Sequence, residues 1–388
     1  MILGIDASNL RVGGGLTHLI EILGAANPPE FGFRRVIVWG NKRSLDNIED
    51  RPWLQKTSDP WLERSLLWRV LWQIHKLPKS IDFFGCDLIF VPGGSYFAKF
   101  RPSAVISQNL LPFEWRELWR FRISVMTLKL LLLRIVQTLT FRRAEGLIFL
   151  SNYAAHTVQQ VVGSTTASTQ IIPHGISRRF LSPVREQSSI SNYSPAKPFR
   201  LLYVSTVSVY KHQDKTALAV VKLREKGINI TLDLVGGGYP ASVKALDRII
   251  KKANKKSHLI RYHGEVDYES LHHFYREADA FIFSSTCENL PIILLEAMAS
   301  GLPIACSRSG PMPEILGDAG IYFDPGRVES IYSCLHELIS DSKLRKLLAE
   351  AASKRVEAYS WDRCATQTFT FLAEIARKKN NYSESRSG

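Results

Sequence analysis

The order of apolar and polar positions alternates between two patterns along most of the chain. Short runs rich in Val, Ile, Leu and Phe are separated by longer stretches with apolar residues at helical spacing. In the first half the strand-like runs lie at 2–5, 35–39, 87–91, 104–107, 146–150 and 170–173. In the second half they lie at 201–205, 231–235, 259–263, 280–284, 303–307 and 320–323. Because strands that alternate with helices form βαβ units, the pattern predicts an α/β protein with parallel sheets.

A polar stretch without periodicity separates the two halves. It is rich in Ser and Pro and predicts a linker at 181–198. A chain of 388 residues is long for one core and suits two domains. We therefore predict a first domain at 1–180 and a second at 199–360. A helical pattern follows at 361–377, and the polar residues 378–388 are expected to form a disordered tail.

Composition indicates a globular protein, with 45% hydrophobic and 22% charged residues. No apolar run reaches the ~18–20 residues that span a bilayer. The first residues lack a basic segment and include Asp6, so they predict a strand and not a signal peptide. The five cysteines are scattered without metal-ligand spacing, which indicates reduced thiols. These features predict a cytoplasmic protein.

The net charge of +14 indicates attraction to an anionic partner, and the placement of the cations narrows the choice. Residues 116–143 carry many Arg and Lys side chains among Leu, Ile, Val and Trp, with Glu117 as their only acid. Residues 61–72 repeat this composition with several tryptophans. Basic helices with Trp and Leu suit a membrane interface, so an anionic membrane surface is an expected partner. The alternative is a pair of core-facing helices with solvated cations.

The passage CENLPIILLEAMASGLP at 287–303 carries the clearest candidate chemistry. A strand-like run ends just before Glu288, and a helical pattern then opens with Pro291 in its first turn. Glu296 lies about a turn and a half inside this helix, which Gly301 ends. Carboxylates at a strand's carboxyl end accept hydrogen bonds from hydroxyls, and a helix start favours phosphate. The arrangement suits a nucleotide-sugar, whereas the alternative is an amphipathic helix with two solvated acids.

Glu288 and Glu296 resemble the E-x7-E signature of retaining glycosyltransferases with the GT-B fold, and their surroundings resemble glycosyltransferase family 4. The resemblance is dense from about residue 171 to 363. Its other motifs are Ile172-Pro173-His174-Gly175-Ile176, Lys211, Val235-Gly236-Gly237-Gly238, His263-Gly264, the segment 310–320 and Phe323-Asp324-Pro325. The resemblance implies two Rossmann-like parallel-sheet domains facing each other across a cleft. The first would hold the acceptor, the second would bind the nucleotide-sugar, and the helix at 361–377 would return to the first.

The resemblance also assigns roles to the main candidates. Lys211 corresponds to a lysine that binds the donor phosphates, Glu288 to a carboxylate facing the donor sugar, and Glu296 to one that accepts from the ribose hydroxyls. The family often has an Arg shortly before this lysine, whereas residues 205–207 are Ser-Thr-Val here. The grip on the diphosphate is therefore expected to rest on Lys211 with hydroxyls and backbone amides. A solvated surface lysine is the alternative.

Further candidates lie in loops of both halves. A glycine turn at 13–15 before a helical pattern lets backbone N–H groups approach phosphate, although such glycines can also simply permit a tight corner. Many relatives place a His-Asp pair where this chain has Gln108 and Asn109, and an amide can bond a sugar hydroxyl but cannot relay a proton. The donor-binding candidates besides Glu296 are Gly14, Gly15, Gln108, Asn109, Gly237, Ser285, Asn289, Leu290 and Ile292. His174 suits either a turn or a ligand contact, and His18 has no assigned role.

The predicted function is retaining, front-face transfer of a hexose from a nucleoside-diphosphate sugar to a glycan or lipid-linked acceptor, in bacterial cell-surface polysaccharide biosynthesis. The chain has no Asp-x-Asp triplet, so we expect no metal and no cofactor. The enzyme would lie at the inner face of the cytoplasmic membrane. An epimerase or phosphorylase of the same fold, or a non-catalytic basic protein that binds membrane or RNA, is the alternative. No nucleic-acid module is recognised, so nucleic acid is not an expected partner.

Overall fold

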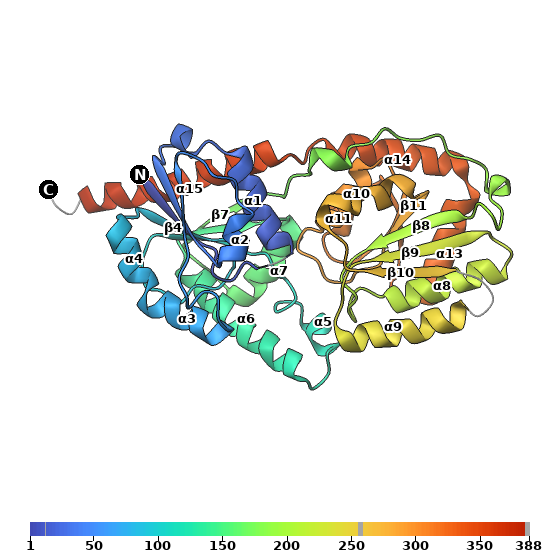
Figure 1. The fold of residues 1–388 in the computed structure, drawn as a ribbon, viewed down its shortest axis with the longest axis horizontal. Coiled ribbons are helices and arrows are strands. Elements are labelled where there is room, and N and C mark those ends of the chain that lie inside the picture. The colour runs from blue at the N-terminus through green and yellow to red at the C-terminus, as the bar shows by residue number, and fades with distance from the viewer. Residues whose placement is uncertain (12, 255–258, 385–388) are drawn as a thin grey trace. The chain divides into compact units, whose positions relative to one another are not determined.

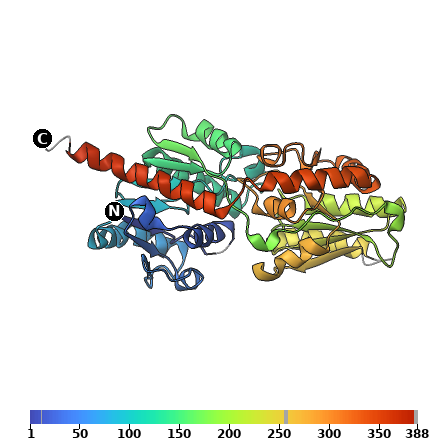
Figure 2. The ribbon, with the colours of Figure 1, turned by 90° about the horizontal axis from the view of Figure 1, so that it is seen from above.

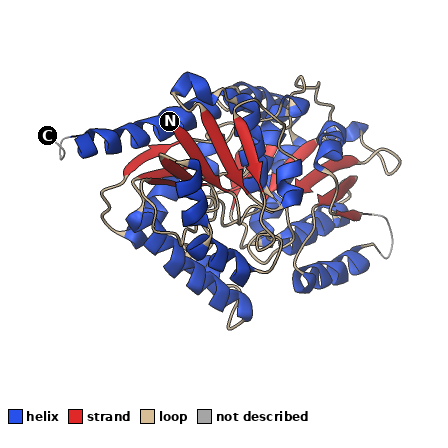
Figure 3. Cartoon of the chain, turned by 60° about the vertical axis from the view of Figure 1, so that its left-hand side comes forward, coloured by secondary structure: helices blue, strands red, loops and turns tan. Residues whose placement is uncertain are grey.

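A computed structural model describes residues 1–11, 13–254 and 259–384. The chain forms two compact units (Figure 1). The first comprises Met1–Gly175 together with Ser360–Gly388, and the second comprises Ile176–Tyr359. Each unit has one sheet with helices on both of its faces (Figure 3).

The sheet of the first unit is parallel and, among the described residues, has seven strands in the order β3-β2-β1-β4-β5-β6-β7. The strands are β1 (Ile2–Asp6), β2 (Arg35–Trp39), β3 (Leu54–Thr57), β4 (Leu88–Val91), β5 (Ser103–Ile106), β6 (Gly146–Phe149) and β7 (Ser168–Ile171). The helices are α1 (Gly14–Ala25), α2 (Lys42–Asp46), α3 (Leu66–His75), α4 (Leu77–Phe84), α5 (Trp115–Trp119), α6 (Val125–Arg143), α7 (Asn152–Val162) and α15 (Trp361–Glu384). Helix α15 packs along this unit beside α1 (Figure 2).

The sheet of the second unit is also parallel, with six strands in the described part and the order β10-β9-β8-β11-β12-β13. The strands are β8 (Phe199–Val204), β9 (Ile230–Val235), β10 (Ile260–Gly264), β11 (Ala280–Phe283), β12 (Ile304–Ser307) and β13 (Ile321–Phe323). The helices are α8 (Gln213–Glu225), α9 (Pro240–Ala253), α10 (Tyr268–Glu277), α11 (Ile292–Ala299), α12 (Met312–Leu316), α13 (Val328–Ser340) and α14 (Ser342–Val356). The central strands β8, β9, β11 and β12 are almost entirely buried.

The predicted fold class, two Rossmann-like parallel-sheet domains, is confirmed. Every predicted strand run overlaps an observed strand. Strand β3 was missed because its sequence, Leu-Gln-Lys-Thr, has no apolar run, and as an edge strand it is only half-buried. All five cysteines are buried, and none of them forms a disulfide bond.

The two basic segments differ in detail from the predicted helices. Helix α3 begins at Leu66, so Trp61 precedes it in a turn. The segment 116–143 contains two helices, α5 and α6, separated at Arg122, which has a left-handed φ of 52°. None of the helices within the described ranges has the length and apolar character needed to cross a bilayer.

The segment predicted as a linker, 181–198, lies within the second unit. The fully buried Arg345 of α14 anchors it, since its guanidinium donates to the Ser188 carbonyl and, over 3.1 Å, to Gln187 Oε1. The boundary between the units falls after Gly175, whereas we predicted the first domain to end at 180. The predicted tail at 378–388 overlaps the end of α15, and residues 385–388 lie outside the described residues.

A buried cluster holds the start of α15 against the first unit. His18 of α1 and His174, after β7, share a hydrogen bond of 2.8 Å between their Nδ1 atoms. The Trp361 ring lies 5.8 Å from the first imidazole and 5.7 Å from the second. Burial lowers the pKa of His18 to about 3 and that of His174 well below its usual value, so both rings are neutral. This geometry gives both histidines a structural role.

Replacement of Gly175 by Ala tests how tightly this cluster is packed. A Cβ there would lie 2.1 Å from the Trp361 backbone nitrogen, so the backbone must shift. We expect Gly175→Ala to lower the free energy of unfolding by about 1–3 kcal/mol, as overpacking does. The matched control is Gly24→Ala near the end of α1, where a Cβ meets nothing within 4 Å. The control should gain about 0.5–1 kcal/mol from reduced backbone entropy. Urea unfolding measures both, and equal stabilities would contradict the close packing.

Candidate functional site

The strand order of the second sheet defines where a ligand can bind. Strands β8 and β11 are neighbours at the centre of the sheet. The chain continues from β8 to β9 toward one edge and from β11 to β12 toward the other edge. In open α/β sheets such a switch in direction leaves a crevice at the carboxyl ends of the two strands. Lys211 lies in the loop after β8, and Glu288 lies in the loop after β11. The fold therefore brings together two candidates that are 77 residues apart in sequence.

Lys211 and Glu288 form an ion pair through Nζ and Oε1. Only 9% of the lysine side chain and 14% of the glutamate side chain are exposed. The ammonium lies 5.3 Å from the Tyr210 ring centroid and 5.5 Å from that of Phe283. A charge withdrawn from water among aromatic rings needs an anion beside it, and Glu288 supplies that anion. A solvated surface lysine does not describe this environment.

The loop that carries Lys211 is held by hydrogen bonds to its backbone. The Tyr203 hydroxyl donates to the Lys211 carbonyl at 2.5 Å, and the Thr286 N–H donates to the Tyr210 carbonyl at 2.9 Å. His212, next along the chain, has φ = 51°, which a non-glycine residue adopts only when its surroundings hold it there. The position of the lysine is thus set by contacts with β8 and with the loop after β11.

Gly237 lies at the same edge of the sheet, in the loop after β9. Its carbonyl accepts a 2.7 Å hydrogen bond from the Val207 N–H. Its neighbour Gly236 has φ = 131° and passes so close to the Ser205 carbonyl that a Cβ would lie 2.4 Å from the oxygen. Glycine is therefore required at 236 for the loops after β8 and β9 to meet.

Glu296 occupies a different environment from Glu288. It lies inside helix α11, is fully buried, and accepts a 2.8 Å hydrogen bond from the Tyr275 hydroxyl. Burial raises the pKa of Glu296 to about 7, against the opposing effect of hydrogen bonds from Tyr275 and Tyr268. The helix ends before Gly301, as predicted, and begins just after Pro291, which is its N-cap residue and does not lie in its first turn. The structure thus surrounds this carboxyl with tyrosines, and its predicted role toward ribose stays a prediction.

The remaining candidates of the second unit lie around the start of α11. Ser285 is fully buried and donates to the Cys287 carbonyl over 3.3 Å. Asn289 and Leu290 are also buried, whereas Ile292 is half-buried in the first turn of the helix. These residues shape the loop that carries Glu288, and their contact with a donor stays a prediction.

The candidates of the first unit gather at the carboxyl edge of its sheet. A Cβ on Gly15 would lie 2.4 Å from Gln108 Oε1, so the glycine turn and this amide are in contact. Gly14 is exposed at the start of α1. Asn109 Oδ1 accepts from the Leu111 N–H at 3.1 Å and shapes its own turn.

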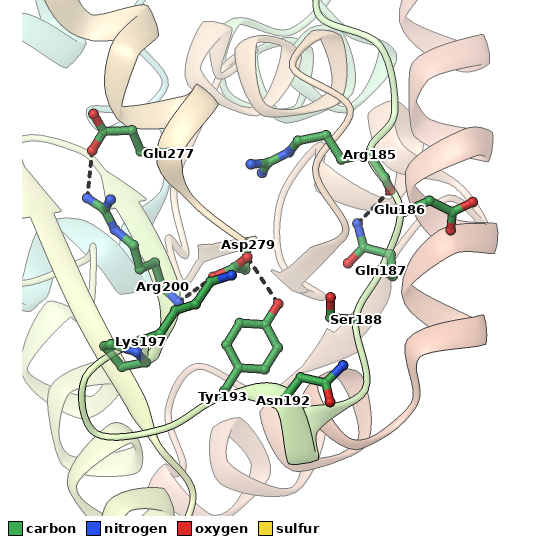
Figure 4. Close-up of a pocket in the computed structure, with 11 residues that line it drawn as sticks. Arg185, Glu186, Gln187, Ser188, Asn192, Tyr193, Lys197, Arg200, Glu277 and Asp279 are labelled. Carbon is green, nitrogen blue, oxygen red and sulfur yellow. Dashed lines mark hydrogen bonds and ion pairs between the residues drawn. The ribbon is translucent and has the colours of Figure 1, made fainter.

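A separate cavity of about 400 Å³ lies at the opposite, amino-terminal edge of the second sheet (Figure 4). Some of its lining side chains contact one another. Arg200 contacts Glu277 at 2.8 Å, and the Tyr193 hydroxyl donates to Asp279 at 3.1 Å. These contacts fasten the segment before β8 to the sheet, which makes the cavity a structural feature.

The described residues include no group of three or more His, Cys, Asp or Glu side chains able to hold a metal ion.

The tyrosines around the site, Tyr203, Tyr210 and Tyr275, were missed by sequence reasoning. Tyr203 and Tyr275 occupy strand and helix positions whose spacing marks them only as core, and Tyr210 is an ordinary loop residue. Nothing in the sequence indicates that their hydroxyls or rings face Lys211 and Glu296.

Comparison with solved structures supports the fold. Sucrose-phosphate synthase from Thermosynechococcus elongatus matches over 98% of this chain and 100% of its own, with a TM-score of 0.77 and 17% identity. HepE from Anabaena, solved in complex with UDP and glucose, matches over 97% of this chain and 100% of its own, with a TM-score of 0.70 and 18% identity. At these identities the likeness concerns the fold, which is that of GT-B glycosyltransferases.

Sequence comparison adds evidence for the second unit. Residues 184–355 match the model of the family Glycosyl transferases group 1. O-antigen chain mannosyltransferase B of Escherichia coli is 28% identical over 229 residues, which cover 59% of this chain and 57% of that protein. The matches span between about a third and just over half the length of the first curated relatives. The resemblance to this group is thus confirmed for the matched segment, and assignment to family 4 stays a prediction.

The buried carboxyl of Glu296 predicts a pH-dependent effect of an amide replacement. Because folding raises its pKa from 4.5 to about 7, the folded protein binds more protons in this window, and stability falls as the pH rises. Glu296→Gln removes this titration while keeping an acceptor for Tyr275. We expect the variant to gain about 2–3 kcal/mol relative to wild type between pH 4.5 and 8. Urea unfolding across this range measures the difference, to which titration of Asp6 and the histidines contributes equally in both proteins. A constant difference would contradict the raised pKa.

Proposed function

We propose that the protein is a retaining glycosyltransferase that transfers a hexose from a nucleoside-diphosphate sugar. The observation that carries the proposal is the Lys211–Glu288 pair at the switch point of the second sheet. It lies within the segment that matches the group 1 glycosyltransferases. A cation and a carboxylate, held side by side and mostly shielded from water, provide one group for a diphosphate and one for a sugar.

Lys211 would stabilise the negative charge that grows on the departing diphosphate. In the structure its ammonium is paired with Glu288. An arriving diphosphate would compete for this ammonium, and the carboxylate would then turn to the sugar hydroxyls. Since electrostatic groups that are already oriented cost little reorganisation, this pair suits catalysis by charge stabilisation. We infer that a metal ion is not needed for this step.

The proton of the acceptor hydroxyl would pass to the departing phosphate oxygen on the same face of the sugar. Gln108, in contact with Gly15, provides an amide at the carboxyl edge of the first sheet. An amide can orient a hydroxyl through hydrogen bonds and does not act as a base. This arrangement favours front-face transfer with retention of configuration.

A glycan or glycolipid acceptor at the cytoplasmic face of a membrane would suit the exposed surface of α6. Leu128, Leu132, Ile135 and Leu139 follow one another at helical spacing, and each is about half-exposed. Arg122, Lys129 and Arg143 are exposed on the same helix or just before it. An apolar ridge flanked by cations matches an anionic membrane surface, in which apolar side chains enter the interface and cations meet headgroups. We infer peripheral binding and a role in cell-surface polysaccharide synthesis.

Removal of the Lys211 charge tests the proposed chemistry. We expect Lys211→Ala to lower the transfer rate by about 10²–10³, as loss of one charge-stabilising contact does. The control is Lys226→Ala, an exposed lysine at the end of α8, which should transfer like wild type. The assay supplies UDP-, GDP- and ADP-hexoses with vesicle-borne glycolipids and identifies the anomer formed. Absence of transfer by wild type, or unchanged transfer by Lys211→Ala, would refute the proposal, and conversion of donor without acceptor would indicate an epimerase.

Charge placed on the α6 ridge tests membrane binding separately. We expect the double variant Leu128→Glu, Leu132→Glu to bind anionic vesicles at least about tenfold more weakly, because two apolar side chains no longer enter the interface. Leu347→Glu, at an exposed leucine of α14, is the matched control. Vesicle co-sedimentation measures binding. Equal binding by the double variant and the control would exclude the ridge as the contact surface.

A further inference from the structure

The first sheet has a switch point of its own, and two arginines lie beside it. Strands β1 and β4 are neighbours. The chain continues from β1 to β2 toward one edge of the sheet and from β4 to β5 toward the other edge. Arg11 lies in the loop after β1, and Arg69 comes from helix α3. The roles proposed for the glycine turn and Gln108 do not involve either guanidinium. The position is nevertheless the place where an open α/β sheet binds ligands.

Helix α3 is fastened to this loop, which fixes the direction of Arg69. Gln73 is buried, and its amide nitrogen donates to Asp6 and, over 3.0 Å, to Ser8 Oγ. Arg69 is one helical turn earlier and thus on the same face of α3. Its Nη1 donates to Asn9 Oδ1 at 3.1 Å. The arginine is therefore held over the carboxyl end of β1.

Arg11 is held from the other side. Its Nη2 donates to the carbonyls of Leu62 and Arg64, at 2.7 and 2.8 Å. The two guanidiniums are close enough for the charge of Arg11, together with burial as the larger cause, to lower the pKa of Arg69. In the described parts of the chain neither forms an ion pair with a carboxylate. Two half-buried like charges without an acid between them suit an anion, and guanidiniums match the oxygens of phosphate.

The surroundings of the pair indicate what the anion is attached to. Leu66 and Leu67, in the first turn of α3, are 59% and 66% exposed. The Arg64 guanidinium lies 4.7 Å above the Trp68 ring. In the view of Figure 1, α3 and α6 both lie along the lower side of the first unit. An anion site beside exposed leucines and a tryptophan suits a phosphate that carries an apolar tail.

We propose that Arg11 and Arg69 bind the phosphate of a lipid-phosphate-linked acceptor. This inference rests on the proposed function, which it deepens by naming the acceptor class. The arginines would act as specificity residues: they hold the phosphate at the switch point of the first sheet while the tail lies against Leu66 and Leu67. The same phosphate chemistry could come from a free anion, so the test compares the two sources.

The test measures binding without any donor, so its outcome does not depend on transfer. Wild type is titrated with farnesyl phosphate, farnesol and inorganic phosphate below the micelle concentration. We expect farnesyl phosphate to bind more tightly than either other compound. Arg11→Gln and Arg69→Gln should each weaken farnesyl phosphate binding about tenfold or more, as loss of a charge-assisted contact does, and leave farnesol binding unchanged. Arg69→Lys, which keeps the charge, should restore part of the affinity.

Lys79→Gln on α4, an exposed cation elsewhere in the unit, is the matched control and should bind farnesyl phosphate like wild type. Thermal unfolding of each variant shows that it is folded. The inference is overturned if the arginine variants bind farnesyl phosphate like wild type, if they lose farnesol to the same degree, or if inorganic phosphate binds as tightly as farnesyl phosphate. Tight, arginine-dependent binding by an enzyme that transfers no sugar would instead refute the proposed function alone.

Discussion

A cation that is largely withdrawn from water must have an anion beside it, and this constraint underlies the site in the second unit. Lys211 meets it with Glu288. The pair exists only because the loops after β8 and β11 meet at the carboxyl edge of the sheet. Hydrogen bonds from Tyr203 and to Tyr210, the left-handed conformation of His212, and the close approach of Gly236 after β9 hold these loops in place. A ligand that brought its own negative charge could take the place of the glutamate without leaving the lysine unpaired.

The two sheets both have cationic side chains at the switch point, but the groups that hold these cations differ. Each is parallel and has a central point at which the strand order reverses, and each places cationic side chains at the carboxyl ends of the central strands. In the second unit the cation is matched by an acid. In the first unit Arg11 and Arg69 are held by backbone carbonyls and an amide, so their charge is directed but not neutralised. That contrast suits a reaction in which one partner is bound through both charge and hydroxyls and the other chiefly through an anionic group.

Several ionisable groups are buried, and their protonation follows from desolvation. His18 and His174 are neutral at the point where α15 joins the first unit. Glu296 titrates near neutrality inside α11 because burial disfavours its charged form more than the tyrosine hydrogen bonds favour it. These groups make stability depend on pH in opposite directions. The histidines lower stability at acid pH, where they become protonated, and Glu296 lowers it as the pH rises and its carboxyl ionises.

The sequence alone was sufficient for the α/β class, for the positions of nearly all strands along the chain, and for the motif around Glu288. These features depend on residues close together in the sequence: local periodicity determines the strands and helices, and Pro291 and Gly301 mark the ends of α11. Strand β3 was not predicted, because an edge strand is only half-buried and needs no apolar run. Only the tertiary structure decided which candidates meet: it paired Lys211 with Glu288, enclosed Glu296 among tyrosines, and set Arg69 beside Arg11. The physical reason is that burial and charge pairing depend on contacts between distant segments, which local patterns do not encode.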